Sequence, residues 1–306
     1  MDFSTVTLRN LEYIVAVAEE AHFGRAAHRC NVSQPTLSVQ IQSLERSLGM
    51  KIFERYGRLV RVTNRGEEVI EQAKVILDET RKLERLARRD SRPLSESFRL
   101  GVIATLGAYL LPHLLRPLKK AYPDLDLVLV EGLTKPLIEH LRLGRLDGLL
   151  ASIPLPSGDF QTEKLFLEPF VLALTPGHRL ARVEQLSPEM LVAEEMLLLQ
   201  DGHCLREQAL EVCPDQNSRL RDRYQATSLE TLRQMVALGL GCTLMPALAT
   251  AEHGMLKGLV RYRTFAKDPP GRLIGLAWRR GSSAAADAIE LATFIRKNLP
   301  GRVRKA

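Results

Sequence analysis

A short alanine-rich segment, a tight turn and a serine-capped amphipathic segment follow one another within residues 25–48. The first segment reads Arg-Ala-Ala-His-Arg-Cys, and its small central side chains allow a neighbouring helix to pack closely. After the turn, Ser33 is a good N-cap, and Pro35 falls in the first helical turn, where its missing N–H does no harm. Apolar residues then recur at helical spacing, at Leu37, Ile41, Leu44 and Leu48. This order is typical of a helix-turn-helix.

The face of the second helix opposite its apolar stripe is polar. It carries hydroxyl, amide and guanidinium groups, which hydrogen-bond base edges and phosphates in a DNA major groove. Polarity alone fits an ordinary solvent-exposed helix better, but the preceding helix and turn favour a recognition helix. The predicted DNA contacts on this helix are Ser33, Gln34, Pro35, Thr36, Ser38 and Arg46.

A basic strand-turn-strand segment at 55–63 follows the second helix. It completes the order of elements in a winged helix-turn-helix, with Arg55, Arg58 and Arg61 predicted to contact DNA on or near the wing. Residues 24–65 contain eight Lys and Arg against two Glu, whereas the whole chain has a net charge of +7. Such a local concentration of positive charge predicts double-stranded operator DNA as a partner.

A long charged segment after residue 66 predicts a dimerisation helix. Its steps of four and three match a heptad seam that pairs with the same helix of a second chain. A dimer would place two recognition helices about one DNA turn, or a multiple of it, apart, which implies a roughly palindromic operator. A turn and hinge are expected at 90–93. The seam consists of Val69, Ala73, Ile76, Thr80, Leu83 and Ala87.

Beyond the hinge, predicted strands and helices alternate. With 306 residues, more than one domain is expected. We divide the chain into a winged helix-turn-helix at 1–65, a linker helix and hinge at 66–92, and an effector domain at 93–306. Alternation favours an open, mostly parallel α/β sheet, with a ligand cleft beyond the strand ends near Thr105 and Thr134. Strands are expected at 98–103, 125–130, 148–151, 170–175, 196–199, 242–245 and 272–277, and helices at 106–121, 135–143, 205–212, 229–238 and 284–299.

Targeting features point to a cytoplasmic protein. The N-terminal residues lack the basic and apolar regions of a secretory signal, and the longest uncharged stretch, 235–251, is interrupted by Gly and Pro and is too short to cross a membrane. In a reducing compartment the four cysteines are expected to be thiols at rest. Without a C-x-x-C pair, a metal site is not expected, and no cofactor is expected either.

Cys204 has the sequence context of a reactive thiol. It follows Asp201-Gly202 at the predicted N-terminus of a helix, where unpaired N–H groups and the helix dipole favour a thiolate. His203, if protonated, and Arg206, if it points toward the sulfur, would act in the same direction. A thiolate that attacks peroxide gives a sulfenic acid, which condenses with a nearby thiol. Most free cysteines are small buried hydrophobes, and this interpretation is kept for Cys30 and Cys242.

The N-terminal motifs resemble those of LysR-type transcriptional regulators. The similarity rests on Phe-Gly-Arg-Ala-Ala at 23–27, Val-Ser-Gln-Pro-Thr-Leu-Ser at 32–38, and the segment from Leu-Glu at 44–45 to Phe-Glu-Arg at 53–55. The family's layout implies a linker helix and a two-subdomain effector domain like a periplasmic binding protein. The resemblance places one subdomain at 95–166 and 267–306 and the other at 167–266. It also implies a homodimer that pairs into a homotetramer, with RNA polymerase as a further partner.

A second motif resembles the hydrogen peroxide-sensing OxyR branch of that family. It reads Asp-Gly-His-Cys-Leu-Arg-Glu-Gln-Ala at 201–209, with Cys213 nearby and Ala-Thr-Ser-Leu-Glu-Thr-Leu-Arg at 226–233. This resemblance makes Cys204 the peroxide-reactive cysteine and Cys213 its reversible disulfide partner. It places Thr105, Thr134, His203, Glu207 and Arg272 in the peroxide pocket. Glu207 stands where that branch usually has Asp, so the carboxylate is kept on a longer side chain.

The spacing of these two cysteines adds a conformational requirement. If the nine residues from Cys204 to Cys213 are helical, their Cα atoms stand about 13 Å apart. A disulfide tolerates about 7 Å at most, so the segment 205–212 must unwind or move, and Pro214 would prevent the helix from continuing. Oxidation is therefore expected to refold this segment and to repack the dimer contacts.

Three other functions remain as alternatives. One is a LysR-type regulator that responds to a small metabolite bound between the effector subdomains, with the cysteines incidental. Another is a thiol peroxidase, which would leave the DNA-binding segment unexplained, and the third is an architectural DNA-packaging protein, which would need no sensor domain. Without a nucleophile elbow, a phosphate-binding loop or a zinc-protease motif, an enzyme is not expected. Thr105 and Thr134 fit equally well as helix caps, because each precedes a predicted helix.

Overall fold

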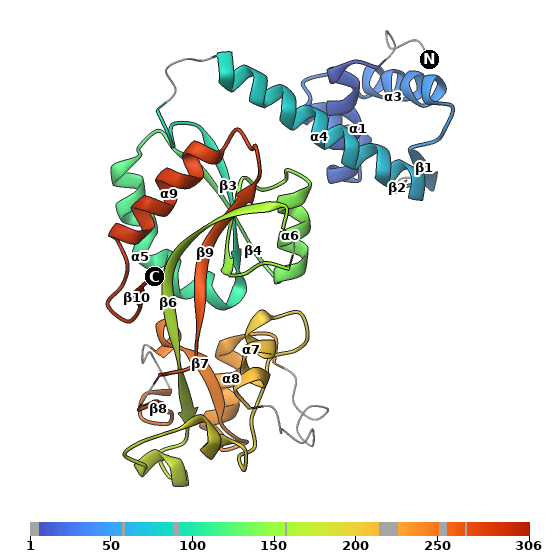
Figure 1. Ribbon diagram of the computed structural model, residues 1–306. Helices are drawn as coiled ribbons and strands as arrows, with labels where there is room; N and C mark the ends of the chain where they lie inside the picture. The colour runs from blue at the N-terminus through green and yellow to red at the C-terminus, as the bar shows by residue number, and fades with distance from the viewer. Residues whose placement is uncertain are drawn as a thin grey trace. The chain divides into compact units, whose positions relative to one another are not determined.

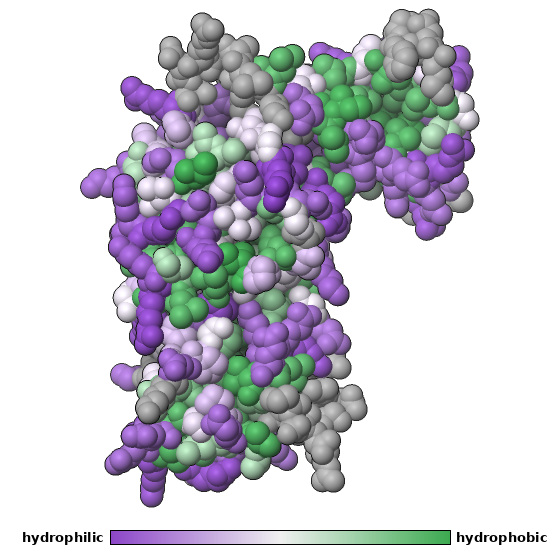
Figure 2. Space-filling model, viewed as in Figure 1, coloured by the Kyte–Doolittle hydropathy of each residue, from purple (hydrophilic) through white to green (hydrophobic). Residues whose placement is uncertain are grey.

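The computed structural model describes residues 6–56, 59–87, 92–156, 158–213, 226–250, 256–266 and 268–306. The chain divides into two compact units, one built mainly from residues 1–91 and the other mainly from 92–306 (Figure 1). In the described part of the chain, no helix is long and apolar enough to cross a membrane. Figure 2 shows hydrophilic side chains over most of the visible surface, with hydrophobic ones exposed in smaller patches.

Three helices build the N-terminal unit around one apolar core: α1 (Leu8–Glu20), α2 (Phe23–Arg29) and α3 (Gln34–Leu48). The predicted cap is confirmed, because the Ser33 side chain accepts a hydrogen bond from the Thr36 N–H at 3.2 Å. Leu37, Ile41 and Leu44 are buried in this core as predicted. Leu48 was placed in the same stripe wrongly, since it is 40% exposed. The helix ends directly after it, so Leu48 extends beyond the core.

A two-stranded hairpin and a long helix complete this unit. Strands β1 (Phe53–Tyr56) and β2 (Leu59–Val62) pair antiparallel, as expected for a wing. Helix α4 (Asn64–Ala87) packs against α1 through Ile70, Ala73 and Leu77, which are buried. Ala73 therefore belongs to the core of its own unit. Of the other predicted seam residues, Ile76 and Leu83 are 39% and 69% exposed in the single chain.

The larger unit is an eight-stranded sheet with helices around it. Its order is β10-β6-β9-β5-β3-β4, and β7 and β8 also pair with β6. The expected mostly parallel sheet is wrong in detail, since β3 is parallel to β4 and β5 but every other strand pair is antiparallel. The cause is that β6 and β9 run antiparallel along each other between the two ends of this unit (Figure 1). The strands are β3 (Ser97–Ile103), β4 (Asp126–Gly132), β5 (Gly148–Ser152), β6 (Phe160–Leu174), β7 (Thr243–Pro246), β8 (Arg261–Thr264), β9 (Gly271–Arg279) and β10 (Arg304–Lys305).

The predicted helices of this unit are confirmed. They are α5 (Ala104–Ala121), α6 (Thr134–Arg142), α7 (Cys204–Val212), α8 (Leu229–Ala237) and α9 (Ala285–Lys297). Short 3-10 turns that the periodicity did not indicate are η2 (Arg179–Arg182), η3 (Pro188–Leu191) and η4 (Ala247–Thr250). The expected strand at 196–199 is wrong, because Met196 and Leu199 make only isolated bridges, to Cys242 and Ala226.

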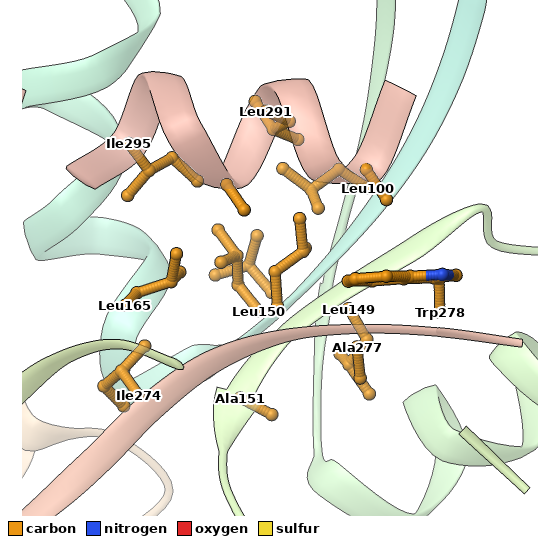
Figure 3. Packing of buried hydrophobic residues seen from close by; sticks show 14 of the residues in the cluster. Leu100, Leu149, Leu150, Ala151, Leu165, Ile274, Ala277, Trp278, Leu291 and Ile295 are labelled. Carbon is orange, nitrogen blue, oxygen red and sulfur yellow. The ribbon is translucent and has the colours of Figure 1, made fainter. Parts of the chain in front are cut away.

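Two hydrophobic cores lie in the larger unit. One is built from β3, β5, α5, α6 and α9 with parts of β6 and β9, and Figure 3 shows Leu291 and Ile295 of α9 lying over Leu149, Leu150 and Leu165. The other contains Phe170 to Leu174 of β6, together with α7, α8 and β7. Residues of α7 thus pack into both, because Cys204 lies against the first core and Leu205 and Ala209 are buried in the second.

Candidate functional site

Cys204 is the first residue of helix α7, and His203 is its N-cap. The chain enters this helix through Gly202, whose φ of +96° is a conformation that favours glycine. The Cys204 thiol is free and half-buried. The thiol thus lies at the helix N-terminus that the sequence predicted, where the first N–H groups lack intrahelical partners.

His203 is not the positively charged neighbour of Cys204 that the sequence analysis allowed. Its side chain is buried, at 6% exposure, and its Nε2 has no hydrogen-bond partner among the described residues. Burial lowers the pKa of His203, and a backbone hydrogen bond with Thr227 only partly opposes this. At neutral pH the imidazole is therefore neutral.

Arg206 is held by groups on the turn before α7. Its Nε lies 2.7 Å from Asp201 Oδ1, and its Nη1 donates to the Leu199 carbonyl at 2.8 Å. The guanidinium charge is thus paired with the Asp201 carboxylate.

A fully buried ion pair lies in the same unit. Arg272 of β9 and Glu168 of β6 are both at or below 1% exposure, and Arg272 Nε donates to Glu168 Oε2 at 2.8 Å. The second Glu168 oxygen accepts from the Leu248 N–H at 3.0 Å. Arg272 Nη1 and Nη2 donate to the Thr105 hydroxyl and carbonyl, at 2.7 and 2.9 Å. Every charged group here is hydrogen-bonded, as burial requires.

The two threonines lie at neighbouring strand ends. Strand β3 pairs in parallel with β4, with Ile103 opposite Gly132, and Thr105 and Thr134 lie in the first turns of the helices that follow these strands. Thr105 is not the cap that was allowed as an alternative, because Ile103 is the N-cap of α5 and Thr105 is buried within its first turn. Thr134 is the half-buried first residue of α6.

Glu207 differs from the other residues predicted for the pocket. Its side chain is exposed in the first turn of α7, whereas His203, Thr105 and Arg272 are buried. The carboxylate buried beside Arg272 is Glu168, which the sequence reasoning missed. The available signal was a lone carboxylate in the otherwise apolar run 165–174.

Gln208 links helix α7 to strand β5. Its Nε2 donates to Ser152 Oγ at 2.7 Å, where Ser152 is buried and Gln208 is half-buried. The Gln208 Oε1 atom is buried without a hydrogen-bond partner among the described residues. This contact, also missed from the sequence, positions the first turns of α7 against the first core.

Cys213 lies at the other end of α7, as its C-cap. It is 1% exposed and is a free thiol. Burial raises the pKa of Cys213 to about 11, so it is protonated at neutral pH. Because residues 204–212 are helical, its Cα lies about 13 Å from that of Cys204, too far for a disulfide in this conformation. Pro214 lies outside the described residues.

The predicted DNA-binding side chains gather at the start of α3 and on its polar face. Ser33, Gln34, Pro35, Thr36 and Arg46 are exposed, and Ser38 is half-buried. The Ser33 and Thr36 hydroxyl oxygens are 2.7 Å apart. On the hairpin, Arg61 is exposed, whereas the Arg55 side chain and all of Arg58 lie outside the described part of the structure.

Comparison with known proteins matches both units. Residues 8–67 match the bacterial regulatory helix-turn-helix protein, lysR family, and residues 91–300 match the LysR substrate binding domain. The hydrogen peroxide-inducible genes activator of Haemophilus influenzae is 42% identical over 278 residues, which are 90% of this chain and 92% of that protein.

Among the solved structures that are similar over nearly the whole chain are two OxyR variants. A full-length OxyR cysteine variant from Pseudomonas aeruginosa gives a TM-score of 0.81 at 39% identity, covering 96% of this chain and 98% of that one. A cysteine variant of Corynebacterium glutamicum OxyR bound to hydrogen peroxide gives 0.64 at 32% identity, covering 95% and 92%. These similarities place the chain among transcription regulators and not among enzymes. With both of its units matched, the chain belongs to the LysR family of bacterial helix-turn-helix regulatory proteins.

Proposed function

We propose that this protein is a DNA-binding transcriptional regulator that senses hydrogen peroxide through Cys204 and records the signal as a reversible disulfide with Cys213. The observation that carries the proposal is the position of the two thiols. One starts helix α7 and is partly accessible, and the other ends the same helix and is buried. The similar proteins named as peroxide-inducible activators and OxyR support the same signal.

The chemistry proceeds in two balanced steps. The Cys204 thiolate attacks one peroxide oxygen, an S–O bond forms as the O–O bond breaks, and the departing hydroxide takes up a proton to become water. The sulfur is now a sulfenic acid. Cys213, once deprotonated, attacks that sulfur, an S–S bond forms, and the hydroxyl group leaves as water. An external thiol reductant then restores both thiols.

Asymmetric burial assigns the two roles. A thiolate is the attacking species, and we assign this role to Cys204, which is partly accessible at the start of α7. Cys213 is held protonated by burial, and helix geometry keeps it about 13 Å away. It therefore acts second, after α7 has unwound enough to bring the two sulfur atoms together.

We place the peroxide pocket beside Cys204. Thr105 and Thr134 lie at adjacent strand ends, Arg272 holds the Thr105 hydroxyl, and His203 precedes the thiol. The neutral His203 has one imidazole nitrogen, Nε2, without a hydrogen-bond partner among the described residues, and this atom would bind a small polar molecule. The exposed Glu207 carboxylate would contribute least in this conformation.

The other domains would transmit the oxidation signal from α7 to operator DNA. The division proposed is a winged helix-turn-helix at 1–65, a linker helix and hinge at 66–92, and an effector domain at 93–306 with subdomains at 95–166 plus 267–306 and at 167–266. The exposed residues of α3 and the hairpin would contact operator DNA. A cytoplasmic homodimer that pairs into a homotetramer would contact RNA polymerase when α7 refolds.

Peptide mapping after oxidation tests the proposal. The reduced full-length protein is exposed to a slight excess of hydrogen peroxide, its free thiols are alkylated, and bridged peptides are identified by mass spectrometry. A rapid Cys204–Cys213 bridge, lost in Cys204→Ser and kept in Cys242→Ser, is expected. Four alkylated thiols after treatment would reject the sensor and favour a LysR-type regulator that binds a small metabolite.

A further inference from the structure

A cavity of about 530 Å³ lies in the larger unit away from Cys204, and none of the residues proposed for the peroxide pocket lines it. Its volume is within the range of small-molecule sites. Its lining includes two buried aromatic residues, Phe170 and Phe265. It also includes the exposed Arg302 and Arg304 from the C-terminal segment.

The charge at the rim selects the class of ligand. Arg302, Arg304 and Asp268 line the cavity, so positive charge is in excess. Among the described residues, neither arginine forms an ion pair with a carboxylate. Arg302 Nη1 donates to Thr250 Oγ1 at 2.7 Å, which fixes that guanidinium beside the cavity while its other N–H groups remain available. Guanidinium groups recognise carboxylates by paired hydrogen bonds.

We propose that this cavity is a second ligand site, which binds a small organic carboxylate with an aromatic or similarly bulky apolar body. The carboxylate pairs with the two arginines, and the apolar body contacts Phe170 and Phe265. Such a ligand has a charged end and an apolar body. It therefore differs from hydrogen peroxide, which has no apolar part.

The walls of the cavity connect it to the buried ion pair. Ala247 and Thr250 of η4 line the cavity, and between them the Leu248 N–H donates to Glu168. Pro169, next to Glu168 in β6, lines the cavity as well. Glu168 in turn holds Arg272, which holds Thr105. A ligand that moves η4 against β6 therefore acts on the groups proposed to surround the Cys204 thiol, and this second part of the inference rests on the proposed function.

Calorimetric titration of the reduced full-length protein tests the site, with 2-naphthoate as the probe and 2-naphthylmethanol as its uncharged counterpart. One equivalent of naphthoate is expected to bind, and the alcohol at least tenfold more weakly. The double variant R302A/R304A should weaken naphthoate at least tenfold, while R116A/R280A, which removes two exposed arginines elsewhere, should not. Ala266→Trp, which adds bulk at the cavity wall, should prevent binding. Equal binding of acid and alcohol, equal binding by R302A/R304A, or no binding at millimolar probe would overturn the site.

A thiol-labelling assay tests the connection to Cys204. The rate at which an alkylating reagent modifies Cys204 is measured with and without saturating naphthoate, with the modified residue identified by mass spectrometry. At least a twofold change is expected in the unaltered chain and none in R302A/R304A. Unchanged labelling would overturn the connection. Because neither assay uses peroxide, a failure of peroxide sensing would not be confused with a failure of this site.

Discussion

At the scale of single residues, the buried Arg272–Glu168 pair carries a large desolvation cost. Both side chains are removed from water, and removal of ions from water costs several kcal/mol each in real proteins. The cost is offset here because the guanidinium and the carboxylate also hydrogen-bond to Thr105 and to the Leu248 N–H. Loss of one partner would leave an uncompensated buried charge.

Replacement of Glu168 by Gln should therefore destabilise the protein strongly. Loss of a buried partner typically costs about 3–5 kcal/mol. The free energy of unfolding, measured by urea denaturation of the reduced protein, should fall by about that amount. Glu163→Gln is the matched control, since the Glu163–Arg296 pair is more than a third exposed on both sides and such pairs contribute about 1 kcal/mol or less. Similar losses in the two variants would contradict the argument.

Cys213 predicts a specific dependence of stability on pH. Burial raises its pKa from 9.0 to about 11, so between these values the unfolded chain loses this proton while the folded chain keeps it. The contribution of Cys213 to the free energy of unfolding should be largest below pH 9. It should decrease as the pH rises toward 11, by at most about 1.4 kcal/mol per pH unit. In Cys213→Ser this contribution should disappear. Urea titrations under reducing conditions measure both slopes, and equal slopes would show that the thiol is not held protonated by the fold.

At the scale of elements, α7 is the part that the proposed chemistry must disrupt. Its two cysteines lie at opposite ends, and the Cys213 N–H still bonds to the Ala209 carbonyl. The sequence indicated both the helix and the need to unwind it, because a regular helix has a fixed rise per residue. Burial of Cys213 and the Gln208–Ser152 contact, which stabilise the helical form, required the tertiary structure.

A weaker α7 should form the disulfide faster. Glu211 is exposed within this helix, and Gly there lowers helix stability by about 1 kcal/mol relative to Ala. If unwinding precedes disulfide formation, Glu211→Gly should form the Cys204–Cys213 bond about fivefold faster than Glu211→Ala after a peroxide pulse. Stopped-time alkylation and mass spectrometry provide the rates. Identical rates would mean that unwinding does not limit the reaction.

Helix α3 carries the prediction for DNA binding. Arg46 is exposed in its last turn, and its Nε donates to the Gln42 carbonyl at 3.4 Å. If Arg46 contacts a phosphate, Arg46→Ala should weaken binding by a similar factor on all sequences and reduce the slope of log affinity against log salt by about 1. Fluorescence anisotropy on specific and random duplexes measures this. A loss confined to the specific duplex would instead assign Arg46 to a base.

At the scale of the whole molecule, α4 presents an apolar side chain that its own unit does not cover. Leu83 is 69% exposed, whereas Ile70, Ala73 and Leu77 on the same helix are buried. An exposed leucine on a long amphipathic helix fits the pairing of two copies along a heptad seam. The single chain does not contain that partner, so dimerisation remains a prediction.

Leu83→Glu should shift the protein from dimer toward monomer. A charge at the seam is unfavourable when the seam is buried, and loss of the dimer should lower operator affinity at least tenfold because the two recognition helices no longer bind together. Analytical ultracentrifugation and anisotropy report the two effects. Gln72→Glu adds the same charge at an exposed polar position and should change neither. A dimer that withstands Leu83→Glu would place the interface elsewhere.

The sequence by itself determined the local elements and the reactive end of α7. Apolar periodicity located the helices of both units, Ser33 marked the start of α3, and the turn before Cys204 marked a helix N-terminus. These features follow from hydrogen bonds and side-chain spacing within a few residues, which a sequence displays directly. The first part of β6 was missed because its residues 161–164 are mostly polar.

The tertiary structure alone decided which distant residues meet. Thr105, Glu168 and Arg272 are far apart in the chain, and the antiparallel pairing of β6 with β9 brings the two charged residues together. Strand direction, the burial of Cys213 and the cavity beside Arg302 have the same origin. Each depends on long-range packing that removes particular groups from water, and no spacing of residues along a chain specifies that packing locally.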